Sequence, residues 1–333
     1  MRGPLRTPTE TRRGRNAAVV RNGPKDGNLR SGVVKMKIGF IGLGAMGKPM
    51  ACNLIAAGYE VHAFDVMEAA VKEMEGKGAI GAATAGELAA RVDVILCSLP
   101  NAKIVEGVMT GKGSVFDNCK KGTVIIDMSS VAPNSTKAMA QKAAQKGISY
   151  IDAPVSGGVS GATAGTLTIM VGADDETFQK VRPVFDVLGK NIYHIGEVGG
   201  GDAIKMVNNL LLGCNMAALA EGLTLGVKCG LSVETMKEVI SVSSGRSYAL
   251  EAKLEKFIMA DQFTGGFAVD LQYKDLGLAL EASRDEKVPL PMTAAAVQVY
   301  EAARAKGQGR EDMSSVVKVW EGLTGAKIRG TGK

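Results

Sequence analysis

The sequence predicts a doubly wound α/β domain followed by an all-α domain. Short apolar segments alternate with helical patterns between Lys37 and about residue 197, as the strands and helices of a parallel sheet do. A glycine cluster, Gly199–Gly201, ends this alternation. Beyond it the strand patterns vanish, and long segments rich in Ala, Leu, Glu and Lys follow. We therefore place the first domain at residues 36–197 and the second at residues 198–333.

The segments expected to form strands are short, apolar and bounded by glycine, proline or polar residues, which is typical of buried parallel strands. The first, KIGFIG, is followed by a glycine turn, a helical pattern that stops at Gly58, and the strand EVHAFD, which closes on Asp65. This order is a βαβ unit. Further strands are expected within residues 93–100, 122–130, 149–158, 166–173 and 191–196.

Length and composition indicate a globular protein with about two domains. The chain of 333 residues exceeds the roughly 250 residues that a single core rarely passes. Its content of 46% hydrophobic and 22% charged residues is typical of a soluble fold. The cysteines form no C-x-x-C pair and lie in apolar segments, so we expect reduced thiols in a cytoplasmic protein.

The sequence also argues against two classes of site. With only His62 and His194, far apart in the chain, a zinc site or a Ser-His-Asp triad is not expected, and we predict no bound metal. No apolar stretch reaches the roughly 18 residues of a membrane span without a glycine or a charge interrupting it. We therefore expect no membrane partner.

The first 35 residues concentrate the positive charge. Nine basic and two acidic side chains give residues 1–35 a charge of +7, so the rest of the chain carries −1 of the total of +6. A near-neutral body lacks the basic face that nucleic acids require, so no nucleic-acid partner is expected. Because the segment contains several Pro and Gly and no apolar run, we predict a disordered basic tail or a true start at Met36. A transit peptide is the less favoured alternative.

A G-x-G-x-x-G motif stands between the first strand and the first helix. Its glycines are Gly42, Gly44 and Gly47, and the intervening residues are Leu43, Ala45 and Met46. In this position the first glycine allows a tight turn, the second lets the backbone approach a pyrophosphate, and the third packs the helix on the strand. The loop and the helix N-terminus are thus predicted to bind a dinucleotide in a Rossmann-type domain. A purely structural glycine turn is the alternative.

Asp65, at the end of the second strand, indicates which dinucleotide is bound. A carboxylate at this position accepts hydrogen bonds from the adenosine ribose 2′-OH and repels a 2′-phosphate. No arginine follows it, and the next cation is Lys72. We therefore predict NAD (NADH) as cofactor, with NADP less favoured. The alternative is that Asp65 only caps the following helix.

The segment GDAIKMVNNLLL, residues 201–212, has the pattern of an apolar helix with Lys205 near its start. The lysine could face solvent, or it could bury its stem and bring its ammonium to the surface. It could also serve as an amine inside a cleft. Asn209 lies one helical turn further along on the same face, where its amide could hold the lysine or a ligand. The motif alone leaves these alternatives open.

The chain resembles the β-hydroxyacid dehydrogenases, the family that contains 3-hydroxyisobutyrate dehydrogenase and 2-hydroxy-3-oxopropionate (tartronate semialdehyde) reductase. The resemblance extends from about Lys37 to Leu323. It depends on four motifs in order: GFIGLGAMGKPMA, DAPVSGGVSGATAGTL, GGGDAIKMVNN and DLQYKDLGLAL. It implies that residues 36–197 bind the dinucleotide and that the helical residues 198–333 serve substrate binding and dimerisation.

The resemblance also implies the residues of a substrate site. Lys205 would be the catalytic lysine, with Asn209 as its partner. Ser156, Gly157 and Gly158 would bind a substrate carboxylate. For this SGG segment the alternative is a simple turn, although N–H groups beside a hydroxyl do form an anion-binding nest.

Further residues match the cofactor loops of the family. Leu99 and Pro100 of SLPN and Ser130 of DMSS would line the cofactor, and Lys274 would close over its nicotinamide end. The strand ends at which these loops lie are where ligands bind in doubly wound sheets. For Lys274 the alternative is a surface ion pair with Asp275, which would contribute little.

The activity implied by the resemblance is reversible hydride transfer to and from a small hydroxy acid, with Lys205 as general acid and base. Tartronate semialdehyde, reduced to D-glycerate, is the favoured substrate, and 3-hydroxyisobutyrate dehydrogenase activity is the alternative. A hypothesis from another class is a catalytically silent NAD-binding regulatory protein. We expect a small carboxylate as ligand and a homodimer or homotetramer as assembly.

Overall fold

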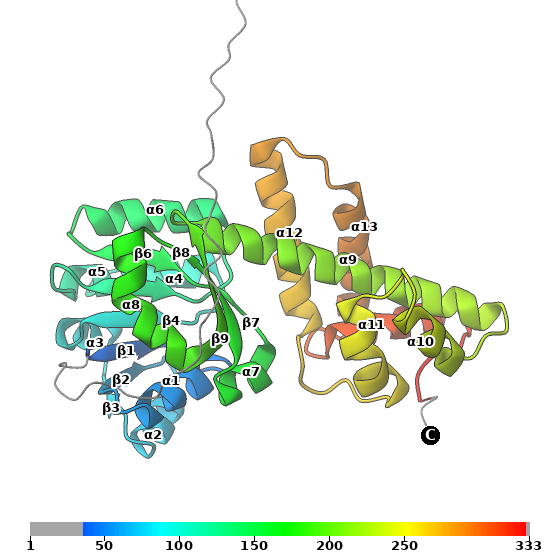
Figure 1. Ribbon diagram of the computed structural model, residues 1–333, viewed down its shortest axis with the longest axis horizontal. Helices are drawn as coiled ribbons and strands as arrows, with labels where there is room; N and C mark the ends of the chain where they lie inside the picture. Colours follow the sequence, from blue (N-terminus) through cyan, green and yellow to red (C-terminus); the bar gives the residue numbers. More distant parts are fainter. Residues whose placement is uncertain (1–35, 331–333) are drawn as a thin grey trace, which may run out of the picture.

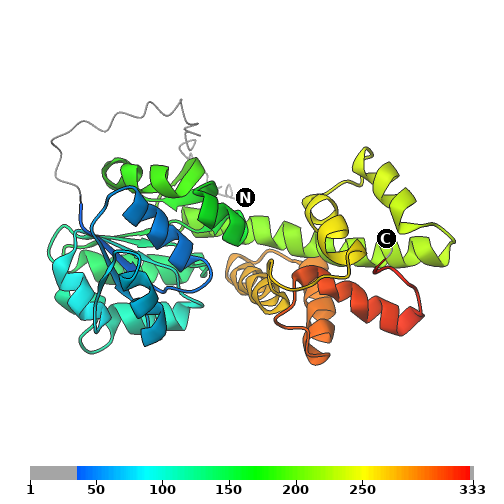
Figure 2. The same ribbon diagram turned by 90° about the horizontal axis from the view of Figure 1, so that it is seen from below.

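The computed structural model describes residues 36–330. The prediction of a disordered basic tail concerns residues 1–35 and lies outside this range. The described chain forms a sheet-containing part and a helical part, and the long helix α9 (Gly200–Lys228) runs from one into the other (Figures 1 and 2). The last strand ends at Gly196, so the two parts meet close to the glycine cluster.

The sheet has nine strands in the order β3-β2-β1-β4-β5-β6-β8-β7, with β9 beside β8. The strands are β1 (Ile38–Ile41), β2 (Val61–Phe64), β3 (Ile80–Gly81), β4 (Val94–Cys97), β5 (Val124–Asp127), β6 (Ser149–Asp152), β7 (Val155–Ser156), β8 (Leu167–Gly172) and β9 (Gly189–Gly196). The chain order reverses between β1 and β4. This is the switch point at which doubly wound sheets bind their ligands.

The strands β1 to β6 pair in parallel, as predicted, but the far side of the sheet differs. There β8 runs antiparallel to β6 and to the two-residue strand β7, and β9 is parallel to β8. The chain therefore turns back after β6, which brings the end of β6 next to the segment where α9 begins. The strands β3 and β7 were not predicted as separate elements, because two residues are too short to show a periodic pattern.

Helices cover both faces of the sheet. One face carries α1 (Gly47–Ala56), α2 (Glu68–Glu75), α7 (Gly158–Ala164) and α8 (Asp175–Leu188) over one buried apolar cluster. The other face carries α3 (Ala85–Arg91), α4 (Ala102–Thr110), α5 (Val115–Asn118) and α6 (Pro133–Ala144) over a second. Side chains at Thr84, Asn101, Ser114 and Asp174 accept hydrogen bonds from the first turns of α3, α4, α5 and α8, which explains where these helices begin.

The helical part is built around the second half of α9. Its other elements are α10 (Val233–Ser241), α11 (Tyr248–Lys253), a π-helical turn η1 (Leu254–Met259), α12 (Val269–Glu286), α13 (Pro291–Ala305), a 3-10 turn η2 (Met313–Val316) and α14 (Val317–Thr324). They share one apolar core in which Tyr300 is the largest fully buried side chain. In Figure 1, α12 and α13 lie across α9 beside the sheet part.

Helix α9 bears on the expectation about membrane spans, and Gly213 and Glu221 interrupt its apolar residues. By length and composition alone it could cross a membrane, and 33% of its most apolar window is buried in this chain. Core helices of soluble proteins meet the same criterion.

Candidate active site

The glycine loop after β1 has the geometry of a phosphate cradle. Gly42 has a φ of +92°, which favours glycine, and a Cβ there would lie 2.4 Å from the carbonyl oxygen of Ser98. A Cβ on Gly47 would lie 1.8 Å from the Gly42 carbonyl oxygen, so α1 can pack on the loop only with glycine at that position. Gly44 faces open space.

No side chain caps α1, whose N-cap residue is Met46. Lys48 donates its N–H to the Gly44 carbonyl oxygen and Pro49 has none, so the N–H groups left for a phosphate are those of the residues just before Lys48. The observed cradle fits the pyrophosphate of a dinucleotide.

Asp65 lies just after β2 and holds the glycine loop. Its Oδ2 accepts a hydrogen bond of 2.7 Å from the backbone N–H of Leu43, and its Oδ1 accepts one of 2.8 Å from Met67. The side chain thus lies beside the loop, where a ribose bound next to the pyrophosphate would meet it. The N-cap residue of α2 is Met67, and no side chain caps this helix. Asp65 binds only the N–H of Met67 itself and not the N–H groups inside α2.

The predicted cofactor loops lie together at the ends of β4 and β5. The backbone N–H of Leu99 donates a hydrogen bond of 2.9 Å to the Ser129 hydroxyl, which ties the SLPN loop to the DMSS loop. Pro100 follows in the first loop and Ser130 in the second. Lys274 reaches the second loop from α12, and its Nζ donates a hydrogen bond of 2.7 Å to the Ser130 carbonyl oxygen. The helical part therefore contacts the cofactor edge of the sheet directly.

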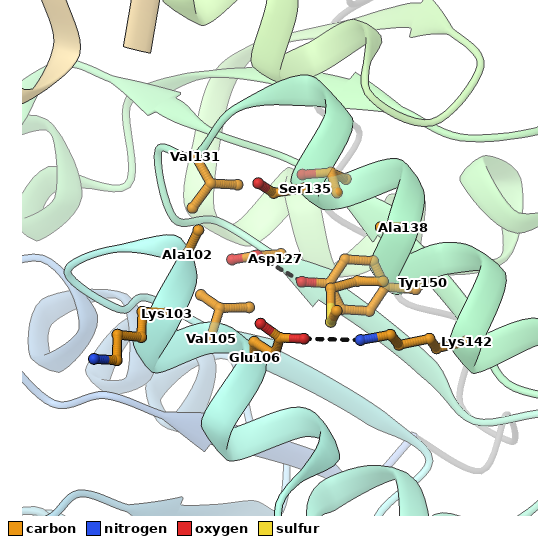
Figure 3. A pocket seen from close by; sticks show the side chains of 12 residues that line it. Ala102, Lys103, Val105, Glu106, Asp127, Val131, Ser135, Ala138, Lys142 and Tyr150 are labelled. Carbon is orange, nitrogen blue, oxygen red and sulfur yellow. Dashed lines mark hydrogen bonds and ion pairs between the residues drawn. The ribbon is translucent and has the colours of Figure 1, made fainter. Parts of the chain in front are cut away.

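Two cavities border this edge. One of about 520 Å³ lies between the glycine loop with α1 and helix α7, and Gly44 and Val159 are among its lining residues. The other, of about 320 Å³, lies between α4 and α6 (Figure 3). Its floor is the buried pair Asp127 and Tyr150, whose hydroxyl donates a hydrogen bond of 2.6 Å to Asp127 Oδ2. Lys205 does not line either cavity.

The SGG segment is an open turn at the start of α7. Ser156 ends β7, Gly157 has a φ of +129° and Gly158 a φ of +63°. Because both glycines have a positive φ, their backbone N–H groups do not point in the directions that they would have in a regular strand or helix. A Cβ on Gly158 would meet nothing within 4 Å, so the backbone there is open to a ligand. Among residues 36–330, no group of three His, Cys, Asp or Glu side chains could hold a metal ion.

Lys205 lies in the second turn of α9, where the helix leaves the sheet part. The residue is partly exposed, and its Nζ makes no hydrogen bond or ion pair with the rest of residues 36–330. Burial of the ammonium is the main cause that lowers its pKa; the charge of Asp275 opposes this effect and that of Lys274 adds to it. An unpaired amine with a lowered pKa is a candidate for proton transfer near neutral pH.

The predicted partnership of Lys205 with Asn209 takes a different form in the structure. Asn209 is 2% exposed, and its amide donates a hydrogen bond to Asp275 Oδ2. Its Oδ1 accepts one of 2.9 Å from Asn208. Both the oxygen and the nitrogen of the Asn209 amide therefore have partners other than Lys205, and the carboxylate whose charge acts on Lys205 is that of Asp275.

Asp275 is the site residue that the sequence analysis missed. It was considered only as the partner of Lys274 in a surface pair, but it is 4% exposed. Its Oδ1 lies 3.1 Å from Lys274 Nζ. Gln272, on the preceding turn of α12, is 0% exposed and donates a hydrogen bond of 2.8 Å to the Asn209 carbonyl oxygen. The available signal was the spacing of Gln272 and Asp275, which places both on one face of a helix.

The glycine loop, the loops after β4 and β5, the SGG turn and Lys205 carry the kinds of group that reversible proton transfer beside a bound dinucleotide requires. The sheet edge supplies a phosphate cradle and a polar loop for the nicotinamide end, and the SGG turn supplies free N–H groups for an anion. Lys205 supplies an amine whose pKa is lowered by burial. The arrangement suits oxidation of an alcohol next to a carboxylate.

Two family profiles cover both parts of the chain. Residues 37–196 match the profile described as the NAD binding domain of 6-phosphogluconate dehydrogenase. Residues 199–320 match the profile described as the NAD-binding region of NADP-dependent 3-hydroxyisobutyrate dehydrogenase.

Individual proteins are similar over nearly their whole length. A 2-(hydroxymethyl)glutarate dehydrogenase of Eubacterium barkeri is 64% identical over 89% of this chain and 98% of its own. A 2-hydroxy-3-oxopropionate reductase of Escherichia coli is 36% identical over 88% of this chain and 100% of its own. The structure of a Mycobacterium tuberculosis 3-hydroxyisobutyrate dehydrogenase with L-serine has a TM-score of 0.80 and 33% identity, and covers 86% of this chain and 99% of its own.

Proposed function

The chain belongs to the β-hydroxyacid dehydrogenase family, and from this we propose that it interconverts 2-(hydroxymethyl)glutarate and the corresponding aldehyde with NAD as cofactor. The observation that carries the proposal is the 64% identity to an enzyme named for this substrate, over 98% of that enzyme. The chain is an oxidoreductase that acts on a CH–OH group, so the hypothesis of a catalytically silent regulator is not retained.

The candidate substrates share one chemical unit. Each is a carboxylate whose α-carbon carries a hydroxymethyl or aldehyde group, and they differ only in the third substituent of that carbon. It is a propionate arm in 2-(hydroxymethyl)glutarate, a hydroxyl in glycerate and a methyl in 3-hydroxyisobutyrate. We propose that the SGG turn binds the carboxylate of this common unit and that Lys205 contacts its alcohol oxygen.

Lys205 is the proposed general acid and base. The nicotinamide of NAD would supply the chemistry of hydride transfer when bound. During oxidation, neutral Lys205 takes the proton from the alcohol oxygen; during reduction, the ammonium returns it. The backbone N–H groups of Gly157 and Gly158, with the Ser156 hydroxyl, orient the substrate carboxylate. Lys274 holds the Ser130 loop against α12 and so keeps the cofactor edge close to Lys205.

A substrate panel tests the proposal. With NAD in excess, kcat/KM is measured for 2-(hydroxymethyl)glutarate, D-glycerate and 3-hydroxyisobutyrate. We expect the first to exceed the others by at least tenfold, or about 1.4 kcal/mol of differential transition-state binding. The Lys205→Met variant, prepared in parallel, measures the background rate.

Tartronate semialdehyde reduction is the second candidate. The glycine-loop, LPN and DMSS motifs favour it, and a reductase of this substrate is 36% identical over its whole length. A preference of this enzyme for D-glycerate in the panel would establish the second candidate and remove the first. A preference for 3-hydroxyisobutyrate would favour the remaining activity of the family.

We also propose that the enzyme works in the cytoplasm as a homodimer or a pair of such dimers. Helix α9 exposes Ile204, Val207, Leu211 and Leu225, with exposed fractions of 41%, 47%, 55% and 67%. Exposed apolar side chains aligned along one helix are typical of a surface covered by another subunit. A second copy of the chain would bury them, and the free thiols of the cysteines agree with a reducing compartment.

A further inference from the structure

We propose that Asp152, at the end of β6, is a positioning residue that fixes the start of α9 and thereby the place of Lys205. The proposal depends on the role assigned to Lys205 under the proposed function. It is carried by the contacts of one fully buried carboxylate with the first turn of the helix that bears this lysine. Asp152 itself lies in the sheet part, in register with Asp127 at the end of β5.

Helix α9 has no capping side chain of its own. Its N-cap residue is Gly199, with a φ of +91°, and glycine has no side-chain acceptor. Asp152 provides the cap from another element: its Oδ1 accepts a hydrogen bond of 2.7 Å from the Gly199 N–H, and its Oδ2 accepts one of 2.8 Å from the Asp202 N–H. Both oxygens of a side chain with 0% exposure therefore bind the first turn of α9.

Glycines make room for this carboxylate on two sides. A Cβ on Gly172 of β8 would lie 2.4 Å from Asp152 Oδ1, and a Cβ on Gly201 of α9 would lie 2.9 Å from Oδ2. The same Cβ on Gly201 would also lie 2.2 Å from the Met170 carbonyl oxygen. The helix start thus approaches β6 and β8 more closely than any other residue type would permit, with Asp152 between them.

A second contact, from another element, holds the same turn. The Thr136 hydroxyl, on α6, donates a hydrogen bond of 2.6 Å to Asp202 Oδ2. The first turn of α9 is therefore tied to β6 and to α6. Lys205 follows Asp202 by three residues, one helical turn along, so a shift of the first turn moves the amine directly.

The cost of this arrangement indicates that it serves more than stability. Burial raises the pKa of Asp152 to about 6, and burial followed by the charge of Asp152 raises the pKa of Asp202 well above its usual range. Asp174, which caps α8 near the surface, behaves in the opposite way. Burial alone would raise its pKa, but the hydrogen bonds from Thr177 outweigh this effect and the pKa is lowered. Folding therefore favours the charged form of Asp174, which caps α8, and disfavours the charged form of Asp152, which caps α9, the helix that carries Lys205.

The experiment compares two matched variants, Asp152→Asn and Asp174→Asn. In Asp152→Asn the amide NH₂ faces one of the two N–H donors, so the start of α9 loses a contact. We expect kcat to fall at least tenfold while the Kd for NADH, measured by fluorescence, stays within twofold. The melting temperature should fall less than that of Asp174→Asn, whose kcat should stay within twofold of the wild type.

Thr136→Val provides an independent test, because it removes the second contact and leaves Asp152 intact. We expect a smaller fall in kcat with unchanged NADH binding. If Asp152→Asn keeps more than half of the wild-type kcat, the positioning role is refuted. A fall in kcat that parallels a loss of NADH binding or of melting temperature shows a merely structural role and refutes it as well. Lys205→Met separates the two proposals, since full activity of that variant refutes the role of Lys205 itself.

Discussion

Asn209 on α9 and Asp275 on α12 are joined by a hydrogen bond from the asparagine amide to the carboxylate. This bond fixes a buried negative charge beside the helix face that carries Lys205. The carboxylate in turn lies 3.1 Å from the ammonium of Lys274. Two charges of opposite sign therefore act on Lys205, and each can be removed by a single substitution.

Removal of these two charges should move the pKa of Lys205 in opposite directions. Asp275 raises this pKa and Lys274 lowers it. In aldehyde reduction the lysine must be protonated, so kcat/KM falls as pH rises through its pKa. Asp275→Asn should shift this alkaline limb to lower pH, and Lys274→Met should shift it to higher pH. If the alkaline limb shifts in the same direction in both variants, it does not report the pKa of Lys205.

Replacement of Lys205 by methionine should abolish proton transfer and leave the fold intact. Methionine is close in length, and it removes an ammonium that burial disfavours. Turnover should fall by about 10² to 10⁴-fold, the usual effect of a lost general acid. Lys205→Arg should not restore it, because a guanidinium keeps its proton near neutral pH. Steady-state kcat decides the matter, and a methionine variant with more than a tenth of wild-type turnover would count against the assignment.

Asp65 should make the enzyme prefer NAD over NADP. Its carboxylate lies beside the glycine loop and would repel a 2′-phosphate. We expect a ratio of kcat/KM of at least tenfold, or about 1.4 kcal/mol. Asp65→Asn keeps an acceptor for the Leu43 N–H and should lower this ratio. Equal use of the two cofactors by the unmodified enzyme would show that Asp65 does not select between them.

The raised pKa of Asp152 predicts how stability changes with pH. The folded state binds this proton more tightly than the unfolded chain, in which the pKa is near its ordinary value of 3.8. The stabilisation from protonated Asp152 is therefore fully present below about pH 3.8 and is lost as pH rises through about 6. Asp152→Asn has no such proton, so its melting temperature relative to the wild type should rise between pH 5 and pH 7. A difference that is constant over this range would contradict the raised pKa.

The exposed side of α9 should control assembly. Leu211 is 55% exposed, so Leu211→Glu should leave the folded subunit intact and place a charge in the proposed interface. Light scattering after size-exclusion chromatography should show a dimer or tetramer for the wild type and a smaller species for the variant. Ile104→Glu, on α4 of the sheet part, is the matched control and should not change the mass. A monomeric wild type would refute the assembly.

The alternation of strands and helices in the sheet part was predictable from sequence. Strands β1, β2, β4, β5 and β6 have apolar runs with clear ends, and the glycine motif places the first turn between β1 and α1. The antiparallel pairing of β8 was not predictable, because an isolated apolar strand carries no mark of its direction. Pairing is decided by where the chain returns, and that depends on contacts between distant residues.

The candidate site shows the same division. Lys205 and the glycine loop were found because their neighbours in sequence form a recognisable pattern. Asp275 and Asp152 act through residues more than forty positions away, so no local spacing shows their partners. The sequence suggested that Asn209 would hold Lys205, and only the packing of α12 on α9 shows that Asp275 occupies its amide.

Helix α9 joins the two parts of the enzyme without a loop, and this has a consequence for how its length can vary. Its 29 residues span about 43 Å at 1.5 Å per residue. Lys205 lies close to the end held by β6 and α6, and Asn209 lies where α12 holds the same helix. One residue inserted between them would rotate everything that follows by about 100° and carry Asn209 away from Asp275. The number of residues between Lys205 and Asn209 therefore fixes how the sheet part and the helical part are rotated relative to each other about the axis of α9.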